Sequence, residues 1–88
     1  MGDFSKKHFL DEVAENLTRI SHALDQGQAL DWVHAAAAIR SVSIIHGEAR
    51  LAGHCRELES IDDPERTPVA ELIFEGIANE YARVVMDN

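Results

Sequence analysis

The sequence predicts an all-α fold, specifically an antiparallel up-down-up-down four-helix bundle, and three observations support this. Apolar residues recur at steps of three and four along nearly the whole chain, which is the period of a helix. Only five glycines and two prolines are present, too few for a turn-rich β protein. The segments between the periodic stretches are short, which favours antiparallel neighbours. With 88 residues, the chain is expected to form a single domain over 1–88.

The first half of the chain predicts two helices separated by a glycine. Residues 5–26 form the first, and Gly27 suits the position just after its end. Residues 28–45 form the second, and Gly47 is the expected break. The second helix has two lines of small and apolar residues. One line holds Leu30, Val33, Ala37, Ser41 and Ile44, and the other holds Trp32, Ala36, Ile39 and Ser43.

The second half predicts two further helices joined by the polar, proline-containing loop 62–66. The third helix covers residues 48–61, and its apolar stripe is Leu51, Cys55, Leu58 and Ile61. The fourth helix opens at Thr67, predicted as its N-cap, with Pro68 at the first helical position. The apolar stripe of the fourth helix is Val69, Ile73, Ile77, Tyr81 and Val84.

Composition excludes several classes of function. Sixteen acidic residues against eight basic ones give a formal charge of −8, which opposes binding to nucleic acid. No apolar run approaches the roughly 20 residues of a membrane span, and the N-terminal residues lack the apolar core of a secretory signal. The single cysteine excludes an internal disulfide framework. These features predict a cytoplasmic protein that acts through protein partners and not at a membrane.

The most informative stretch lies in the middle of the chain. It comprises Ala36, Ala37, Ala38, Ile39, Arg40, Ser41, Val42 and Ser43, followed by Gly47, Leu51, Cys55, Leu58 and Glu59. This pattern resembles, without a gap, the signature of histidine-containing phosphotransfer (HPt) domains, Ala-His-x-Leu-Lys-Gly-Ser, then Gly-Ala-x-x-Leu, then Cys-x-x-Leu-Glu. Arg40 falls on the lysine of that signature and Ser41 on its small residue. The spacing of Phe9, Leu10, Asn16, Leu17, Leu24 and Gly27 is also similar to the first long helix of such domains.

The sequence differs from the family signature at the residue that would accept the phosphoryl group, because this phosphoacceptor position falls on Ala37. In an intact domain, an imidazole there takes a phosphoryl group from a receiver domain's aspartyl phosphate, and a basic side chain one turn on steadies its oxygens. The resemblance implies a phosphocarrier and signalling module, not an enzyme, without a cofactor or metal. Its partner would be the receiver domain of a response regulator or hybrid sensor histidine kinase in a two-component phosphorelay.

On this interpretation the docking surface comprises His34, Ala37, Arg40 and Ser41, but the methyl group of Ala37 cannot hold phosphate. We therefore expect the chain as written to be silent in phosphotransfer. Two origins of Ala37 stay open: a natural HPt-like domain without the histidine, or a His-to-Ala variant of an active one.

The other reactive side chains allow different interpretations. His34, one turn before Ala37, could act as a displaced acceptor, but the residue three positions on is alanine and not a base. His46, His54 and Cys55 lack the compact spacing of a zinc site, so no metal is expected. Cys55 is predicted to be a buried packing residue. The acidic residues Glu57, Glu59, Asp62, Asp63 and Glu65 are predicted to form a solvated rim.

A second hypothesis comes from a different functional class. The chain would be a non-enzymatic adaptor or regulatory bundle that binds a partner helix outside phosphorelay signalling. A large exposed apolar stripe on one face of the bundle would favour it.

Overall fold

A computed structural model describes the backbone of residues 2–87 and the side chains of residues 6–87. The described residues form helices joined by short turns and contain no strand. Its elements are α1 (Gly2–Gln26), α2 (Ala29–Ile45), α3 (Ala49–Glu59), the 3-10 turn η1 (Pro64–Arg66) and α4 (Thr67–Met86). The predicted all-α class with four helices is therefore confirmed over this range. None of the helices in residues 2–87 is both long and apolar enough to cross a membrane.

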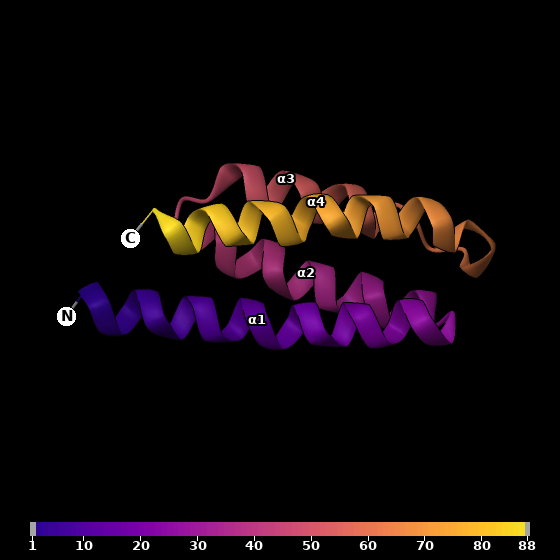
Figure 1. Cartoon of the computed structure of the whole chain (residues 1–88), viewed down its shortest axis with the longest axis horizontal. Coiled ribbons are helices and arrows are strands. Elements are labelled where there is room, and N and C mark those ends of the chain that lie inside the picture. Colours follow the sequence, from indigo (N-terminus) through magenta and orange to yellow (C-terminus); the bar gives the residue numbers. More distant parts are fainter. Residues whose placement is uncertain (1, 88) are drawn as a thin grey trace.

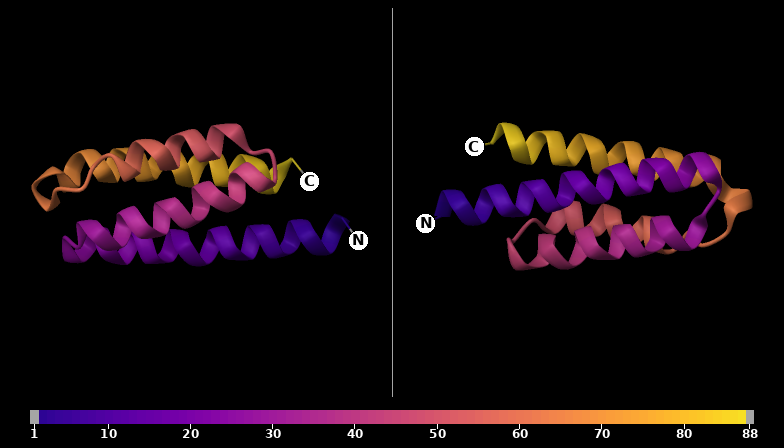
Figure 2. Two further views of the ribbon diagram at one scale, coloured as in Figure 1. Left: turned by 180° about the vertical axis from the view of Figure 1, so that it is seen from behind. Right: turned by 90° about the horizontal axis from the view of Figure 1, so that it is seen from below.

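The helices lie side by side along one long axis, as Figures 1 and 2 show, and the molecule measures 43 × 18 × 18 Å. The start of α1 and the end of α4 lie at the same end of this axis (Figure 1). Helix α2 packs against α1 and α3, and α4 packs against α3 and α1. Helix α2 therefore has two covered flanks, one against α1 and one against α3, and an outer face between them.

Two glycines terminate the first two helices, as the sequence predicts. Gly27 has φ +65° and Gly47 has φ +74°, in the left-handed region that residues with a Cβ adopt only at a cost. At each site the next residue donates its N–H to a carbonyl in the preceding turn: Gln28 to Ala23 at 2.9 Å and Glu48 to Ser43 at 2.8 Å. These bonds satisfy carbonyls that a helix end would otherwise leave unpaired.

Several helix ends differ from the prediction: α2 begins at Ala29 and α3 at Ala49, one residue later than predicted in each case, and three further differences are larger. Helix α1 begins at Gly2, before the predicted start at residue 5, and α3 ends at Glu59 instead of residue 61. The last turn before Ile61 is tightened, because its N–H bonds the carbonyl three residues back at 3.0 Å. Thr67 is not the N-cap of α4: it is the first helical residue, and its hydroxyl donates to the Pro64 carbonyl at 2.6 Å. The physical reason is that a 3-10 turn runs directly into α4.

The core is centred on the inner line of α2. Trp32, Ala36, Ile39 and Ser43 are all fully buried. The indole Nε1 of Trp32 donates to the Ile61 carbonyl at 2.6 Å, so the largest core side chain also satisfies the backbone just after α3. Of the two lines that the sequence shows on α2, this one therefore packs inward, and the line through Ala37 is left for the surface.

Candidate functional site

The outer face of α2 carries the predicted site residues. We define this face by the side chains Leu30, Val33, His34, Ala37, Arg40, Ser41 and Ile44. Leu30, Ala37 and Ile44 are seven residues apart and so lie on one line along the helix. Leu30 is 68% exposed and Ile44 is 54% exposed, while the smaller residues occupy the centre of the face. The face thus carries large apolar side chains at both ends and small side chains at its centre.

Ala37 lies at the centre of this face. It is half-buried, and its neighbours His34 and Ser41, one turn to either side, are exposed. Arg40 follows one turn after Ala37 and is displaced from it around the helix toward α3, where its guanidinium meets Glu59. A side chain at position 37 is therefore accessible from outside the bundle, with one basic group beside it.

Arg40 forms a two-bond ion pair with Glu59 of α3. Its Nε donates to Glu59 Oε2 at 2.5 Å, and its Nη2 donates to Oε1 at 3.1 Å. The side chains are 30% and 19% exposed, respectively. The prediction that Glu59 belongs to a solvated acidic rim is therefore wrong for this residue, because the carboxylate is tucked between two helices. The other four residues of the predicted rim, Glu57, Asp62, Asp63 and Glu65, are exposed.

The ion pair decides what Arg40 can offer a ligand. The hydrogen bond and charge of Glu59 raise the pKa of Arg40 above its usual value, so the guanidinium is charged at any physiological pH. Two of its five N–H groups are committed to Glu59, which leaves the others for an anion. Because Glu59 also cancels the charge, Arg40 attracts a phosphoryl group less strongly than a free arginine would.

Cys55 lies beneath this pair, and its thiol is unreactive at neutral pH. It is fully buried, and burial, reinforced by the negative charge of Glu59, raises the pKa of its thiol to about 12, while Arg40 acts in the opposite direction. A thiol rather than a thiolate is therefore present at neutral pH, and the thiolate is the reactive form. Cys55 is thus a packing residue, as predicted.

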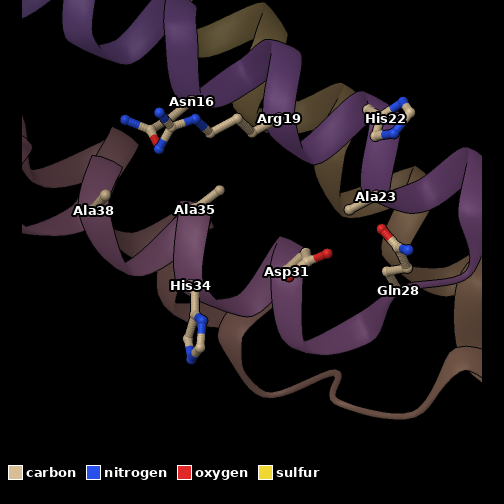
Figure 3. A pocket seen from close by; sticks show the side chains of 9 residues that line it. All are labelled: Asn16, Arg19, His22, Ala23, Gln28, Asp31, His34, Ala35 and Ala38. Atoms are coloured by element: carbon tan, nitrogen blue, oxygen red, sulfur yellow. The ribbon is translucent and has the colours of Figure 1, made fainter.

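The histidines are distributed over separate parts of the bundle. His34 points away from α1 toward solvent in Figure 3. The ring of His46 stacks on Phe9, with centroids 4.5 Å apart. His54 Nδ1 lies 3.4 Å from Glu57 Oε1 on the same helix. In the described part of the chain, no three His, Cys, Asp or Glu side chains come together as a metal-binding group.

Two features of the site were missed from the sequence. The Arg40–Glu59 pair joins residues 19 positions apart, and local periodicity carries no signal for such a contact. A groove between α1 and α2 is lined partly by Ala23, Ala35 and Ala38. A run of small residues on a helix that faces another helix was the only available hint of that groove.

No protein-family model matches the chain, and no curated protein or solved structure is significantly similar to it. The interpretation of the site therefore depends on the residues themselves and on where the fold puts them.

Proposed function

We propose that the chain is an HPt-like module of a two-component phosphorelay, and that its α2 outer face docks the receiver domain of a response regulator or hybrid sensor histidine kinase. Ala37 stands at the phosphoacceptor position. The module binds receivers but carries no phosphoryl group, and it acts as a signalling component rather than an enzyme.

The observation that carries this proposal is the coincidence of a sequence register with a surface. The ungapped HPt-like pattern runs from Ala36 to Glu59 and assigns Ala37 as the phosphoacceptor position. The half-buried side chain of Ala37 is open to the outside of α2, and a basic residue follows one turn later. Had Ala37 been sealed in the core like Ala36, the register would have had no chemical meaning.

The shape of the outer face supports docking of a folded domain. Leu30 and Ile44 supply apolar contact area at the two ends, and Ala37 and Ser41 leave the centre shallow. Apolar anchors around a central position are how protein interfaces exclude water from the groups they surround. A shallow centre would let the aspartyl pocket of a receiver come close to the helix.

The same proposal includes two finer points. The helices form an antiparallel up-down-up-down bundle, in which α2 and α3 make the hairpin that presents Ala37. The module works in the cytoplasm, where receiver domains and their kinases exchange phosphate.

The test is a titration of ¹⁵N-labelled chain with a panel of receiver domains, followed by amide chemical shifts. We expect saturable shifts centred on Ala37 and Ser41 with at least one receiver. Ser41→Arg places a bulky cation on the outer face and should abolish binding. Ser21→Arg, at a serine on α1 that is also exposed, is the matched control and should bind normally. Shifts confined to α1 or α4, or equal effects of both variants, would contradict the proposal.

A second candidate function has an observation of its own. Apolar side chains are also exposed on one side of α4: Leu72 is 69% exposed, and Val69, one turn earlier, is 38% exposed. An adaptor that binds a partner helix would use such residues. Replacing Leu72 with Asp should weaken partner binding if the adaptor function holds, and should leave receiver binding unchanged if the first proposal holds.

A further inference from the structure

A hollow lies at the end of the bundle where α2 begins and where the chain passes from α3 to α4. Figure 1 shows this junction at the same end of the long axis as the turn between α1 and α2. The volume of the hollow is about 360 Å³. Its lining comprises four residues around the start of α2 and two of the α3–α4 loop: Gln28, Ala29, Leu30, Asp31, Asp62 and Pro64. The lining therefore combines apolar side chains with two carboxylates.

One buried hydrogen bond holds the two parts of the hollow together. Trp32 Nε1 donates to the Ile61 carbonyl at 2.6 Å, and both residues are buried. Asp31 directly precedes Trp32, and Asp62 directly follows Ile61. The two carboxylates therefore belong to segments whose relative position is fixed before any ligand binds. A preformed surface of this kind loses less conformational entropy on binding than a mobile one.

The charge of the hollow is negative and is not neutralised within the described chain. Asp31 and Asp62 are both exposed, and none of the ion pairs among residues 6–87 involves either carboxylate. Arg66 follows Pro64 by two residues but does not line the hollow. Asp31 lies in the first turn of α2, where the positive end of the helix dipole stabilises it, so Asp62 carries the less compensated charge. Three further exposed carboxylates belong to the same end of the bundle: Asp25, Asp63 and Glu65.

The apolar part of the hollow narrows the choice of ligand. Leu30 is 68% exposed and Pro64 is also exposed, so water covers both in the free chain. The aliphatic stem of an arginine or lysine packs on such a surface while its charged head stays at the polar edge. Two carboxylates repel an anion, and a small inorganic cation would leave the apolar side chains uncovered. The complementary ligand is therefore a cation on an aliphatic stem.

We propose that this hollow docks a basic segment of a partner protein, in which an arginine or lysine stands next to an apolar residue. The cationic head pairs with Asp62 and Asp31, and the aliphatic stem and the apolar neighbour cover Leu30 and Pro64. Gln28 is neutral and offers a donor and an acceptor to the backbone of the segment. The formal charge of −8 attracts such a partner from a distance. Leu30 is shared with the α2 outer face, but Asp62 and Pro64 are not, so this docking is separable from receiver binding.

The experiment uses two capped tetrapeptides as probes: acetyl-Leu-Arg-Leu-Arg-amide and its counterpart with glutamine in place of both arginines. Each is titrated into ¹⁵N-labelled chain at low and at physiological ionic strength. With the arginine peptide we expect saturable shifts of the Leu30, Asp31 and Asp62 amides, and weaker binding as salt rises. The glutamine peptide should bind about fivefold more weakly, the size expected for exposed ion pairs. Equal responses to both peptides, or linear shifts spread over the whole acidic surface, would overturn the proposal.

A matched pair of variants makes the result specific. Asp62→Asn removes the less compensated carboxylate and should weaken binding of the arginine peptide about fivefold. Asp11→Asn, at an exposed aspartate in the other half of the bundle, removes the same charge and should have almost no effect. Circular dichroism establishes that both variants are folded. Full binding by folded Asp62→Asn, or an equal loss in Asp11→Asn, would overturn the proposal.

Two further outcomes separate this docking from other events. Ser41→Arg, the variant that tests receiver docking, should leave peptide binding nearly unchanged, so each proposal can fail without the other. Loss of peptide binding in Ser41→Arg would show that the peptide binds the α2 outer face and would overturn the assignment to the hollow. Shifts at Asp62 that grow with protein concentration without any peptide would assign the hollow to a second copy of this chain. That result would also overturn the proposal.

Discussion

The two flanks of α2 treat buried polar groups differently. On the α3 flank, both carboxylate oxygens of Glu59 accept from Arg40, and the indole of Trp32 donates to Ile61. On the α1 flank, Asn16 Oδ1 is buried without a hydrogen-bond partner, as is Ser43 Oγ on the inner line of α2. The first arrangement joins elements far apart in the sequence, and the second leaves hydrogen-bonding capacity unused.

This difference shows where polar contacts between helices stabilise the fold and where a buried polar atom is left without a partner. Satisfied polar contacts between helices fix how α2 and α3 sit against each other, and therefore how the outer face is presented. A buried polar group without a hydrogen-bond partner lowers the stability of the fold. Substitutions on the two flanks should therefore change the free energy of unfolding in opposite directions.

The largest expected effect belongs to Trp32 on the α3 flank. Trp32→Ala should lower the free energy of unfolding by about 3–5 kcal/mol, because it leaves a large cavity and removes the donor to the Ile61 carbonyl. Urea unfolding followed by far-UV circular dichroism measures this loss. Trp32→Phe keeps an aromatic ring and should cost clearly less. A loss below about 1 kcal/mol for Trp32→Ala would mean that the ring is not the centre of the core.

The next effect is the alkaline stability that depends on Cys55. The folded thiol has a pKa of about 12, whereas an unfolded thiol has a pKa of about 8.5. The folded state therefore holds this proton more tightly, so its contribution is complete below the unfolded pKa. It is lost as pH rises through the interval between the two values, at about 1.4 kcal/mol per pH unit.

Cys55→Ala isolates this contribution, because other groups titrate in the same pH range in both proteins. The difference in unfolding free energy between the unchanged chain and Cys55→Ala should shrink steadily from pH 9 to pH 11. A difference that is constant with pH would show that the thiol is not shielded from water in the way its burial implies.

A smaller loss is expected from breaking the Arg40–Glu59 pair. Arg40→Met leaves a half-buried carboxylate without its partner and should lower the urea midpoint. Glu59→Gln should reduce it as well, and the double variant should lose less than the sum of the two single losses. Equivalent substitutions in the exposed Arg19–Glu15 pair, in which both side chains are about two-thirds exposed, serve as the control and should show almost no coupling. Strict additivity for Arg40 and Glu59 would contradict the pairing.

The smallest effect, and the one of opposite sign, is expected on the α1 flank. Asn16→Leu removes an unpaired buried oxygen and adds apolar contact, so it should leave stability unchanged or raise it by about 1 kcal/mol. Chemical unfolding in the absence of ligand is the measurement. A loss above about 1 kcal/mol would show that the Asn16 side chain supports the fold and that the two flanks do not differ.

Much of the fold can be predicted from the sequence because it depends on local periodicity. The steps of three and four predict four helices. The two lines on α2 separate Trp32 and Ile39, which are fully buried in the structure, from Ala37 and Ser41, which are half-buried and exposed. Gly27 was predicted as a helix terminator because the left-handed conformation suits glycine.

The features that were missed depend on how the helices meet. The side of α3 that faces Arg40 is set by tertiary packing, so Glu59 was assigned to the solvent by mistake. Thr67 matches an N-cap pattern, but the preceding 3-10 turn takes its hydroxyl for the Pro64 carbonyl. The groove arises because alanines from two helices face each other, and neither helix alone reveals it.

The most direct test of the central claim is phosphoryl transfer to position 37. Ala37→His and the unchanged chain are each incubated with a phosphorylated, radiolabelled receiver domain that binds the chain. We expect acid-labile label on Ala37→His and none on the unchanged chain. Label on the unchanged chain, or no label on Ala37→His despite receiver binding, would contradict it.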